Sequence, residues 1–297
     1  MSNEYIANEL TLTREQIKYG LIKLGIIIFL VFGWLWWIKV YQNPIRVFWD
    51  MFGVSLNTSD VTRHIVESSN GQKVDETVQL ELGKTKLAHL TRTVAQGTNI
   101  FSTETISTPS VYYTRYTSLH IVNNGKTLNS NSVLNIWSKS ALGNSSGAVN
   151  DFFSLLGSVP VGFPTTAQRQ ALLKQIKAKR IFVPDFSKVQ HKTISGQRAD
   201  VYNVTIEPAA YVALMQTYAK DEGLGTLTEL EASNYKNASS FEVQFAINPI
   251  SRRLVQISST GSNHIETYSA YGQQLHVNLP TKTITTDALQ QRLAAIQ

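Results

Sequence analysis

The stretch GLIKLGIIIFLVFGWLWWI, residues Gly20–Ile38, decides the architecture of this chain. Its nineteen residues contain one charge, Lys23, and as a helix they span about 28 Å, which matches a hydrocarbon core of roughly 30 Å. From Leu24 to Ile38 there are ten Leu, Ile, Phe or Val residues, which at about −0.5 kcal/mol each favour membrane insertion by roughly 5 kcal/mol. Residues 19–41 are therefore expected to form a transmembrane helix.

The residues at both ends of this segment fit the two membrane interfaces. Lys23 lies one turn inside the start, where its long side chain reaches the interface. Trp34, Trp36 and Trp37 place three of the five tryptophans within four residues, and Tyr41 follows just beyond. Such rings favour the boundary between membrane and water. We expect an aromatic belt there and favour it over a contact with a partner helix.

The orientation of the helix follows from its flanks. Three basic residues precede or open the segment and two follow closely, which favours a cytoplasmic N-terminus. A first hydrophobic segment behind a short tail acts as a signal-anchor, and no small-residue cleavage pattern follows Trp37. We expect a single-pass protein of the cell membrane, with residues 1–18 as a cytoplasmic tail and residues 43–297 outside the cytoplasm.

The overall composition is that of a folded protein. The 297-residue chain is 42% hydrophobic and 16% charged, with a formal net charge of +6 and no cysteine. Disulfide frameworks, cysteine-ligated metals and cysteine nucleophiles are therefore excluded. A large exported domain without cysteine indicates a bacterial cell envelope.

An amphipathic helix is predicted directly after the membrane, over residues 43–56. Asn43 is a favourable N-cap, and Pro44 fits the first helical position. The apolar positions follow at helical spacing and are Ile45, Phe48, Trp49 and Phe52. This juxtamembrane helix either lies on the bilayer or docks into the protein's own core, and we favour docking.

Residues 57–297 are expected to form one α+β domain. The predicted strands cover 61–67, 73–82, 86–95, 99–107, 111–121, 188–195, 198–206, 241–247, 253–259, 263–269 and 274–279. The predicted helices cover 149–156, 166–179, 208–220, 227–236 and 287–296, the second opened by a Thr165-x-x-Gln168 capping box. Short connections between strands favour antiparallel pairing, and Asn124-Gly125 is the strongest hairpin turn. The prediction is an antiparallel sheet of about eleven strands with covering helices.

The order strand–strand–helix–strand, closed by Tyr271-Gly272-x-x-Leu275-x-Val277-x-Leu279-Pro280, resembles LolA-type and LppX-type envelope lipoprotein carriers over roughly residues 57–297. The resemblance implies that the sheet curls into a half-barrel whose apolar concavity, lidded by helices, holds acyl chains. LppX-type proteins carry a lipidated cysteine, and here a transmembrane helix stands in its place. A tethered chain does not ferry cargo as a soluble LolA-type carrier does.

Catalysis is not expected. Gly143-Asn144-Ser145-Ser146-Gly147 matches the G-x-S-x-G pattern, but that elbow belongs on a parallel sheet, and we favour a flexible loop. The six histidines contain no i, i+4 pair, so no metal site and no cofactor are expected. The chain is predicted to be a non-enzyme.

The excess positive charge of the exported part is concentrated between residues 165 and 192. This segment either faces anionic lipid headgroups or wall polymer, or is a solvated helix, and the spread of the charges around the helix favours the latter. If it is functional, the headgroup-binding candidates are Arg169, Lys174, Lys177, Arg180, Lys188 and Lys192.

Two functions remain open from the sequence. The first is a membrane-anchored, non-catalytic extracytoplasmic protein that binds lipid or lipoprotein acyl chains. The alternative is an envelope scaffold that binds another membrane protein or an anionic wall polymer. Nucleic acid is not an expected partner of a domain outside the cytoplasm.

Overall fold

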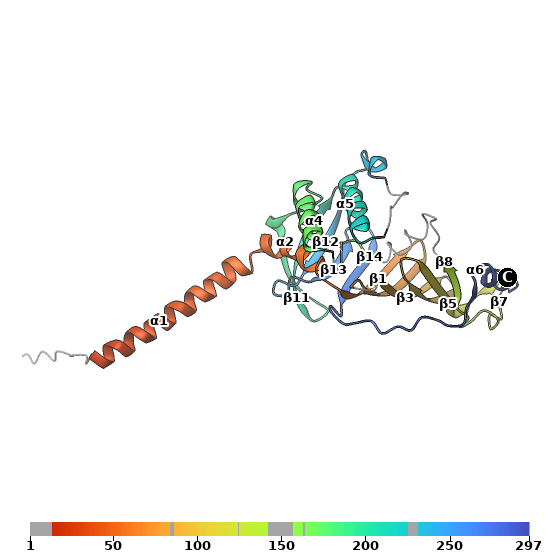
Figure 1. Ribbon diagram of the computed structural model, residues 1–297, viewed down its shortest axis with the longest axis horizontal. Helices are drawn as coiled ribbons and strands as arrows, with labels where there is room; N and C mark the ends of the chain where they lie inside the picture. The colour runs from red at the N-terminus through yellow and green to blue at the C-terminus, as the bar shows by residue number, and fades with distance from the viewer. Residues whose placement is uncertain are drawn as a thin grey trace, which may run out of the picture.

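The computed structural model describes residues 14–83, 86–123, 125–141, 157–162, 164–224 and 231–296. Helix α1 (Arg14–Trp36) continues into a π-helical turn, η1 (Trp37–Tyr41). The segment Leu21–Tyr41 is long and apolar enough to cross a membrane, and its apolar stretch is not buried in the rest of the protein. Figure 1 shows α1 projecting away from the folded domain. The helix expected from the sequence is therefore present.

Helix α2 (Pro44–Ser55) follows almost at once and packs into the core. The side chain of Asn43 accepts a hydrogen bond from the Ile45 backbone N–H at 2.9 Å, and proline stands at the first helical position, as predicted. The buried face differs from the predicted one and consists of Val47, Phe48, Met51, Phe52 and Ser55. Ile45 is 50% exposed, because it lies in the first turn, where the chain leaves α1.

One large open sheet forms the body of the domain. Its first part is an antiparallel meander of β1 (Asp60–Ser69), β2 (Gln72–Glu81), β3 (Leu87–Gln96), β4 (Asn99–Ser107) and β5 (Val111–His120). The second part contains β9 (Phe182–Pro184), β10 (Gln190–Ile194), β11 (Gln197–Ile206), β12 (Phe241–Ile247), β13 (Leu254–Ser259) and β14 (Asn263–Ser269). Strand β14 pairs with β1 and joins the two parts. The tight turn between β10 and β11 has positive φ angles at Ser195 (49°) and Gly196 (75°), which suits a two-residue hairpin.

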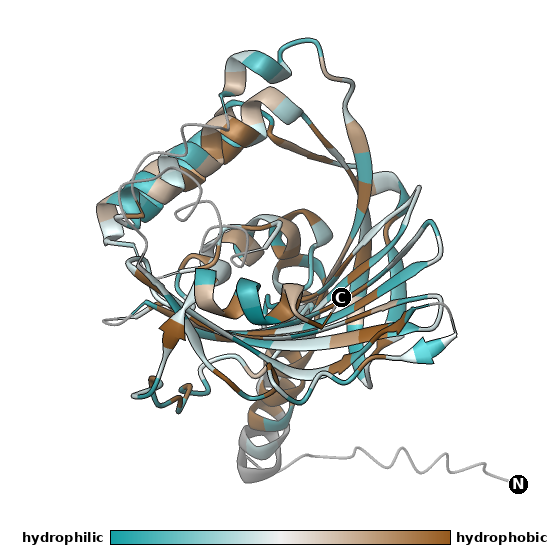
Figure 2. Ribbon diagram, turned by 90° about the vertical axis from the view of Figure 1, so that its right-hand side faces the viewer, coloured by the Kyte–Doolittle hydropathy of each residue, from teal (hydrophilic) through white to brown (hydrophobic). Residues whose placement is uncertain are grey.

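The sheet contains thirteen strands, and its path from edge to edge runs β10-β11-β12-β13-β14-β1-β2-β3-β4-β5-β8-β15, with β9 paired to β11. Strands β8 (Ser138–Ala141) and β15 (Ile284–Thr285) are parallel, so the sheet is mostly antiparallel rather than wholly so. A separate hairpin, β6 (Val122–Asn123) with β7 (Lys126–Thr127), flanks the predicted turn. Figure 2 shows that the sheet is strongly curved and not closed.

The helices lie on the concave side of the sheet and at its far end. α4 (Thr166–Ala178), which begins at the predicted capping box, and α5 (Pro208–Asp221) share one hydrophobic core with α2. Helix α6 (Thr286–Ala294) packs Leu289 beside Leu119 and Val133 at the opposite end. Two short 3-10 helices, η2 (Phe186–Lys188) and η3 (Ala232–Tyr235), complete the described elements.

The segment 274–279 was predicted to be a strand, and this is wrong. It runs without strand pairing, and Leu275 and Val277 pack against a cluster around Leu87 and Ile106. Because adjacent residues of a strand point to opposite faces, this cluster lies on the other side of the sheet from Ala88 and the main core. The alternation of apolar residues therefore serves to pack a crossing segment onto the convex face.

Three predictions fall wholly or largely outside the described residues. These are the helix at 149–156, the Gly143–Gly147 loop and the first part of the helix at 227–236, whose described part contains only η3.

The main core is closed by aromatic rings from α2, and it occupies the concave side where α2 docks. The ring of Phe48 lies 5.3 Å from that of Tyr202 and 6.1 Å from that of Phe245, measured between centroids. Phe52 lies 4.8 Å from Phe182. All five side chains are at most 1% exposed, so this part of the concave surface is filled by the protein itself.

Candidate functional site

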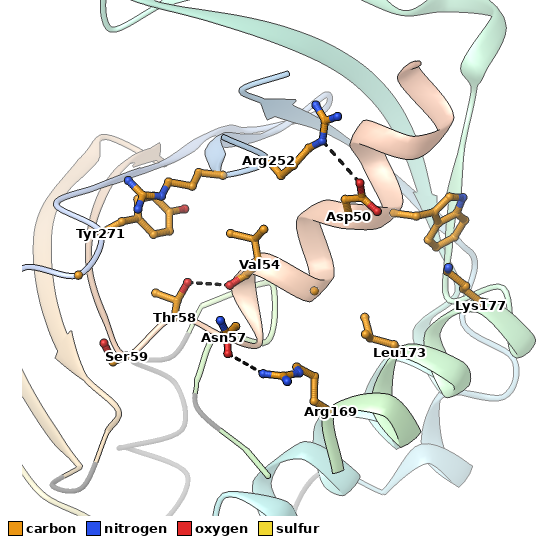
Figure 3. Close-up of a pocket in the computed structure, with 14 residues that line it drawn as sticks. Asp50, Val54, Asn57, Thr58, Ser59, Arg169, Leu173, Lys177, Arg252 and Tyr271 are labelled. Atoms are coloured by element: carbon orange, nitrogen blue, oxygen red, sulfur yellow. Dashed lines mark hydrogen bonds and ion pairs between the residues drawn. The ribbon is translucent and has the colours of Figure 1, made fainter. Parts of the chain in front are cut away.

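A pocket of about 650 Å³ opens between α2, α4, the turn that joins β12 to β13, and the chain just after β14 (Figure 3). Four basic side chains line it, and they are Arg169, Lys177, Arg252 and Arg253. Asp50 is the one acidic residue in its described lining, so the formal charge of the wall is +3. Trp49, Leu173 and Tyr271 add apolar surface. The pocket thus combines positive charge with apolar walls.

Arg252 is the most constrained of these groups. It is 6% exposed and adopts a positive φ of 61° in the β12–β13 turn. The turn holds that conformation because the side chain of Asn248 accepts hydrogen bonds from the backbone N–H groups of Ile250 and Ser251 at 3.0 Å. The Arg252 backbone N–H in turn donates to the carbonyl of Asn248 at 2.9 Å. The local sequence therefore places a guanidinium inside the protein next to the pocket.

The guanidinium of Arg252 contacts α2 and the end of α1. Its Nε lies 3.6 Å from the Asp50 carboxylate, and its Nη2 donates to the backbone carbonyl of Tyr41. The same group stacks 4.3 Å above the Tyr41 ring. Its Nη1 is buried and finds no hydrogen-bond acceptor among the described residues. A buried N–H without an acceptor costs roughly 1–3 kcal/mol, so the other contacts of Arg252 hold this guanidinium in place against that cost.

The other basic residues have few acidic partners. Arg169 donates to the side-chain oxygen of Asn57 at 2.6 Å, and Lys177 lies 5.7 Å from the Trp49 ring. Arg253 stacks 5.0 Å above the Tyr271 ring, whose hydroxyl donates to the carbonyl of Leu254 at 2.6 Å. Stacking on aromatic faces holds these cations in place without neutralising them. Their charge therefore remains available to an anion.

A second, shallower groove of about 510 Å³ lies between the end of α1 and α2. It shares Trp49, Asp50 and Lys177 with the pocket, and it adds Lys39 and Arg46. Asp50 is 3.4 Å from Arg46 as well as 3.6 Å from Arg252, so its charge is already matched. Positive charge therefore continues from the pocket toward the end of α1.

The predicted headgroup residues separate into two groups. Arg169 and Lys177 line the pocket, and they come from the face of α4 that is turned toward α2. Lys174, Arg180, Lys188 and Lys192 are exposed and do not line it, and Lys188 pairs with Asp185 at 3.2 Å. At 3.6 residues per turn, Leu173 lies between Arg169 and Lys177 around α4, whereas Lys174 lies farther around the helix from Arg169 and outside the face that lines the pocket.

Sequence reasoning missed Arg252 and Arg253. The search for basic runs favours long segments such as 165–192, whereas these two residues form a single pair in a turn. The pattern Asn-Pro-Ile-Ser-Arg-Arg between two predicted strands was the available indication, because it places a dibasic pair at the end of the sheet.

The predicted membrane-interface residues belong to α1 and η1. Trp34, Trp36 and Trp37 are 63%, 53% and 38% exposed, and Lys23 lies in α1. Tyr41 stacks on Trp37 at 4.5 Å between centroids and reaches the folded domain through Arg252. The aromatic group thus sits where the long helix meets the domain.

A second polar cluster lies on the concave side of the sheet, around Glu266. This carboxylate accepts hydrogen bonds from Ser158 at 2.8 Å and Tyr268 at 2.6 Å and lies 3.1 Å from His264. Burial alone would raise the pKa of Glu266, but these hydrogen bonds and the charge of Arg63 lower it to about 2. The hydrogen bond to Glu266 raises the pKa of His264 above 6.5. The cluster is satisfied internally and serves packing.

No group of three or more His, Asp or Glu side chains in the described part of the chain is placed to hold a metal ion. Gly157 stands beside the Glu266 cluster at φ 91°, and a Cβ there would lie 2.7 Å from Arg63 Nη1, so the buried Arg63 side chain would have to shift. Compared with protein-family models and with curated protein sequences, the chain matches none of them.

Proposed function

We propose that this protein is a single-pass, non-catalytic binding protein of the cell membrane. In this proposal α1 is the anchor, the N-terminal tail is cytoplasmic and the folded domain is extracytoplasmic. The pocket between α2, α4 and the β12–β13 turn takes the anionic headgroup of a lipid or lipoprotein. The observation that carries the proposal is Arg252, a guanidinium 6% exposed on the pocket wall, with an Nη1 that no described group accepts from.

The chemistry of the pocket favours a phosphate or carboxylate. Nη1 of Arg252 is buried, so the side chain has to shift slightly toward the pocket before an oxyanion can accept from it, and the charge-assisted hydrogen bond then replaces a donor without an acceptor. Arg169, Lys177 and Arg253 line the same pocket and add further positive charge to it. Arginine binds such groups through two parallel N–H donors, which adds geometric selection to the attraction.

The pocket is also larger and less polar than a bare ion requires. Its volume of about 650 Å³ and the surfaces of Trp49, Leu173 and Tyr271 leave room for the backbone of an amphiphile beside its charged group. The adjoining groove leads to the end of α1, so a ligand whose chains stay in the bilayer reaches the pocket from the side of the anchor. These two features favour a membrane lipid over a soluble anion.

A half-barrel cavity for acyl chains is a second proposal, supported by the curvature of the sheet (Figure 2). Two features of the described residues weigh against a long apolar channel. The end near α2 is filled by Phe48 and Phe52, and further along the concave surface carries Arg63, which lies 3.8 Å from Glu76. We therefore place headgroup recognition ahead of acyl-chain enclosure.

The scaffold role, with another membrane protein or a wall polymer as partner, is the alternative. The edge strand β10 favours it, because within the described sheet β10 pairs with β11 alone and residues 190–193 are exposed. An open strand edge can accept an extended segment of a partner. However, a lysine on such an edge commonly prevents pairing, and Lys192 occupies this one.

Native mass spectrometry of the full chain, extracted from membranes without delipidation, tests the proposal. We expect a stoichiometric anionic lipid on the native chain and its loss in Arg252→Gln. Lys177→Gln is the second test variant, because this exposed side chain supports the pocket without holding the fold. Lys192→Gln is the matched control, since it removes the same charge from an exposed site away from the pocket.

Lipid retained in Lys192→Gln and lost or weakened in both pocket variants supports the proposal. A chain without bound lipid that instead co-purifies with a membrane protein favours the scaffold role. Lipid bound equally by the native chain and all three variants shows that the pocket is not the binding site and favours the half-barrel cavity instead.

A further inference from the structure

The joint between α1 and the domain is too short to be a stalk. η1 ends at Tyr41 and α2 begins at Pro44, so only two residues lie between them. Both are used in helix ends: Gln42 donates its backbone N–H to the carbonyl of Trp37 at 2.9 Å, and Asn43 caps α2. The domain therefore starts within one turn of the end of the apolar helix.

Contacts across the joint fix it further. The Tyr41 hydroxyl donates to the carbonyl of Ile250 at 3.1 Å, and the ring lies beneath the guanidinium of Arg252. The segment Leu21–Tyr41 contains 21 residues, which as a helix span roughly 31 Å and so place Tyr41 at the membrane interface if α1 crosses a bilayer. The β12–β13 turn is held at that level by its contacts with Tyr41.

The surface around the joint has the composition of a membrane-binding face. Ile45 and Ile250 are 50% and 52% exposed and lie on two different elements beside Tyr41. Lys39, Arg46 and Lys177 line the same groove as Ile45 and add positive charge there. Apolar side chains among basic ones bind the boundary of an anionic leaflet, where the former enter the acyl region and the latter meet the headgroups. Figure 1 shows α1 leaving from this end of the molecule.

We infer that the domain is seated directly on the anionic surface of the bilayer that holds α1, with Ile45 and Ile250 in contact with lipid. This inference rests on the membrane anchor in the proposed function and adds the orientation of the domain. The surface is continuous with the anchor and complementary in charge to anionic headgroups, which is why a bilayer is its partner. The pocket then opens at headgroup level, so that lipid enters it by lateral movement.

The absence of cysteine makes the test direct, because each introduced cysteine is the only one in the chain. The full chain is placed in nanodiscs and labelled with a fluorophore at one of four substitutions: Ile250→Cys, Ile45→Cys, Leu279→Cys or Leu30→Cys. Leu279 is the matched control, since it is 48% exposed but lies on the segment that crosses the convex face. Lipids with a quencher near the headgroup or deep in the acyl chain report the depth of each label.

We expect headgroup quenchers to reduce the fluorescence at positions 250 and 45 and to leave position 279 unchanged, with a stronger effect in anionic than in zwitterionic nanodiscs. Deep quenchers should act on position 30. Quenching at 30 without quenching at 250 means that the domain stands away from the bilayer and overturns the inference while the anchor remains. No quenching at 30 shows that α1 does not span, which contradicts the proposed function itself. Equal quenching in both lipid compositions removes the role of the anionic surface.

Discussion

Strands β11 to β13 and strands β14 to β2 line the same concave surface of one sheet and both contribute to its apolar core, but buried Arg63 and Glu266 lie only among the latter. Under the former, Tyr202 and Phe245 are fully buried against Phe48 of α2. Under the latter, Arg63 and Glu266 are 3% and 4% exposed and are held by ion pairs and hydrogen bonds. The apolar region, around Phe48, excludes water by packing. The charged region, around Arg63 and Glu266, stays buried because ion pairs and hydrogen bonds hold its charged groups.

This difference explains why the proposed binding site lies at the rim. The apolar surface against which α2 docks is already filled, and the surface around Arg63 and Glu266 carries buried charge. Arg252, on the wall of the pocket at the end of α2, has a buried donor for which the described residues supply no acceptor.

The largest expected effect is on the apolar region. Phe48→Ala should lower the free energy of unfolding by about 3–5 kcal/mol, because it removes a fully buried ring that contacts aromatic rings on α2, η2, β11 and β12. Ile45→Ala is the matched control on the same helix, and its 50% exposed side chain should contribute little. Chemical unfolding of the full chain in detergent micelles, followed by the far-ultraviolet dichroism of the sheet, measures both. Similar losses in the two variants would show that α2 does not dock as described.

Much of this framework could be read from the sequence. β4, β12 and β14 match their predicted bounds, because alternation and turn residues agree there. The capping box at Thr165 and the N-cap at Asn43 were also correct, since capping depends on neighbouring residues alone. Local patterns are reliable where the chain needs no distant partner to define the element.

The structural features that the sequence does not predict depend on contacts between distant segments. The alternation in 274–279 is real, but only the folded sheet shows that it packs across the convex face. Ile45 fits the apolar spacing of α2, yet the position of α1 leaves it exposed. The site divides in the same way. Arg169 and Lys177 belong to a basic segment that can be recognised in the sequence. Arg252 instead lies in the β12–β13 turn and contacts Tyr41, which is more than 200 residues earlier in the chain. No single-sequence pattern joins residues at that separation.

A smaller effect is expected in the charged region. Glu266→Gln keeps the shape of the side chain but removes the charge that His264, Tyr268 and Ser158 stabilise. A hydrogen bond to a charged group contributes about 1.5–3 kcal/mol to stability, so we expect the free energy of unfolding to fall by about 2 kcal/mol. Glu242→Gln, on an exposed position of β12, is the control and should be close to neutral. If both variants unfold alike, the charged region contributes no specific stability.

The smallest expected effect is a dependence on pH, and it separates the two regions without any change of volume. The pKa of His264 is raised above 6.5 by its hydrogen bond to Glu266, so its contribution is complete below pH 6.5 and is lost as the pH rises through the raised value. The pKa of Glu266 is lowered from 4.5 to about 2, so its contribution is present above pH 4.5 and is lost as the pH falls toward 2. Because His264 is 31% exposed, we expect its contribution to stability to be below about 1 kcal/mol.

Three variants test this pH dependence. His264→Gln should flatten the fall in stability above pH 6.5, whereas His276→Gln, on the exposed crossing segment, should leave the curve of the native chain unchanged. Phe48→Ala, in contrast, should shift the whole curve downward without altering its shape, because the ring packs on Phe245 and on Tyr202, and burial raises the pKa of Tyr202 so far that its hydroxyl stays protonated over this pH range. A change of shape in Phe48→Ala would show that the two regions are coupled through the sheet.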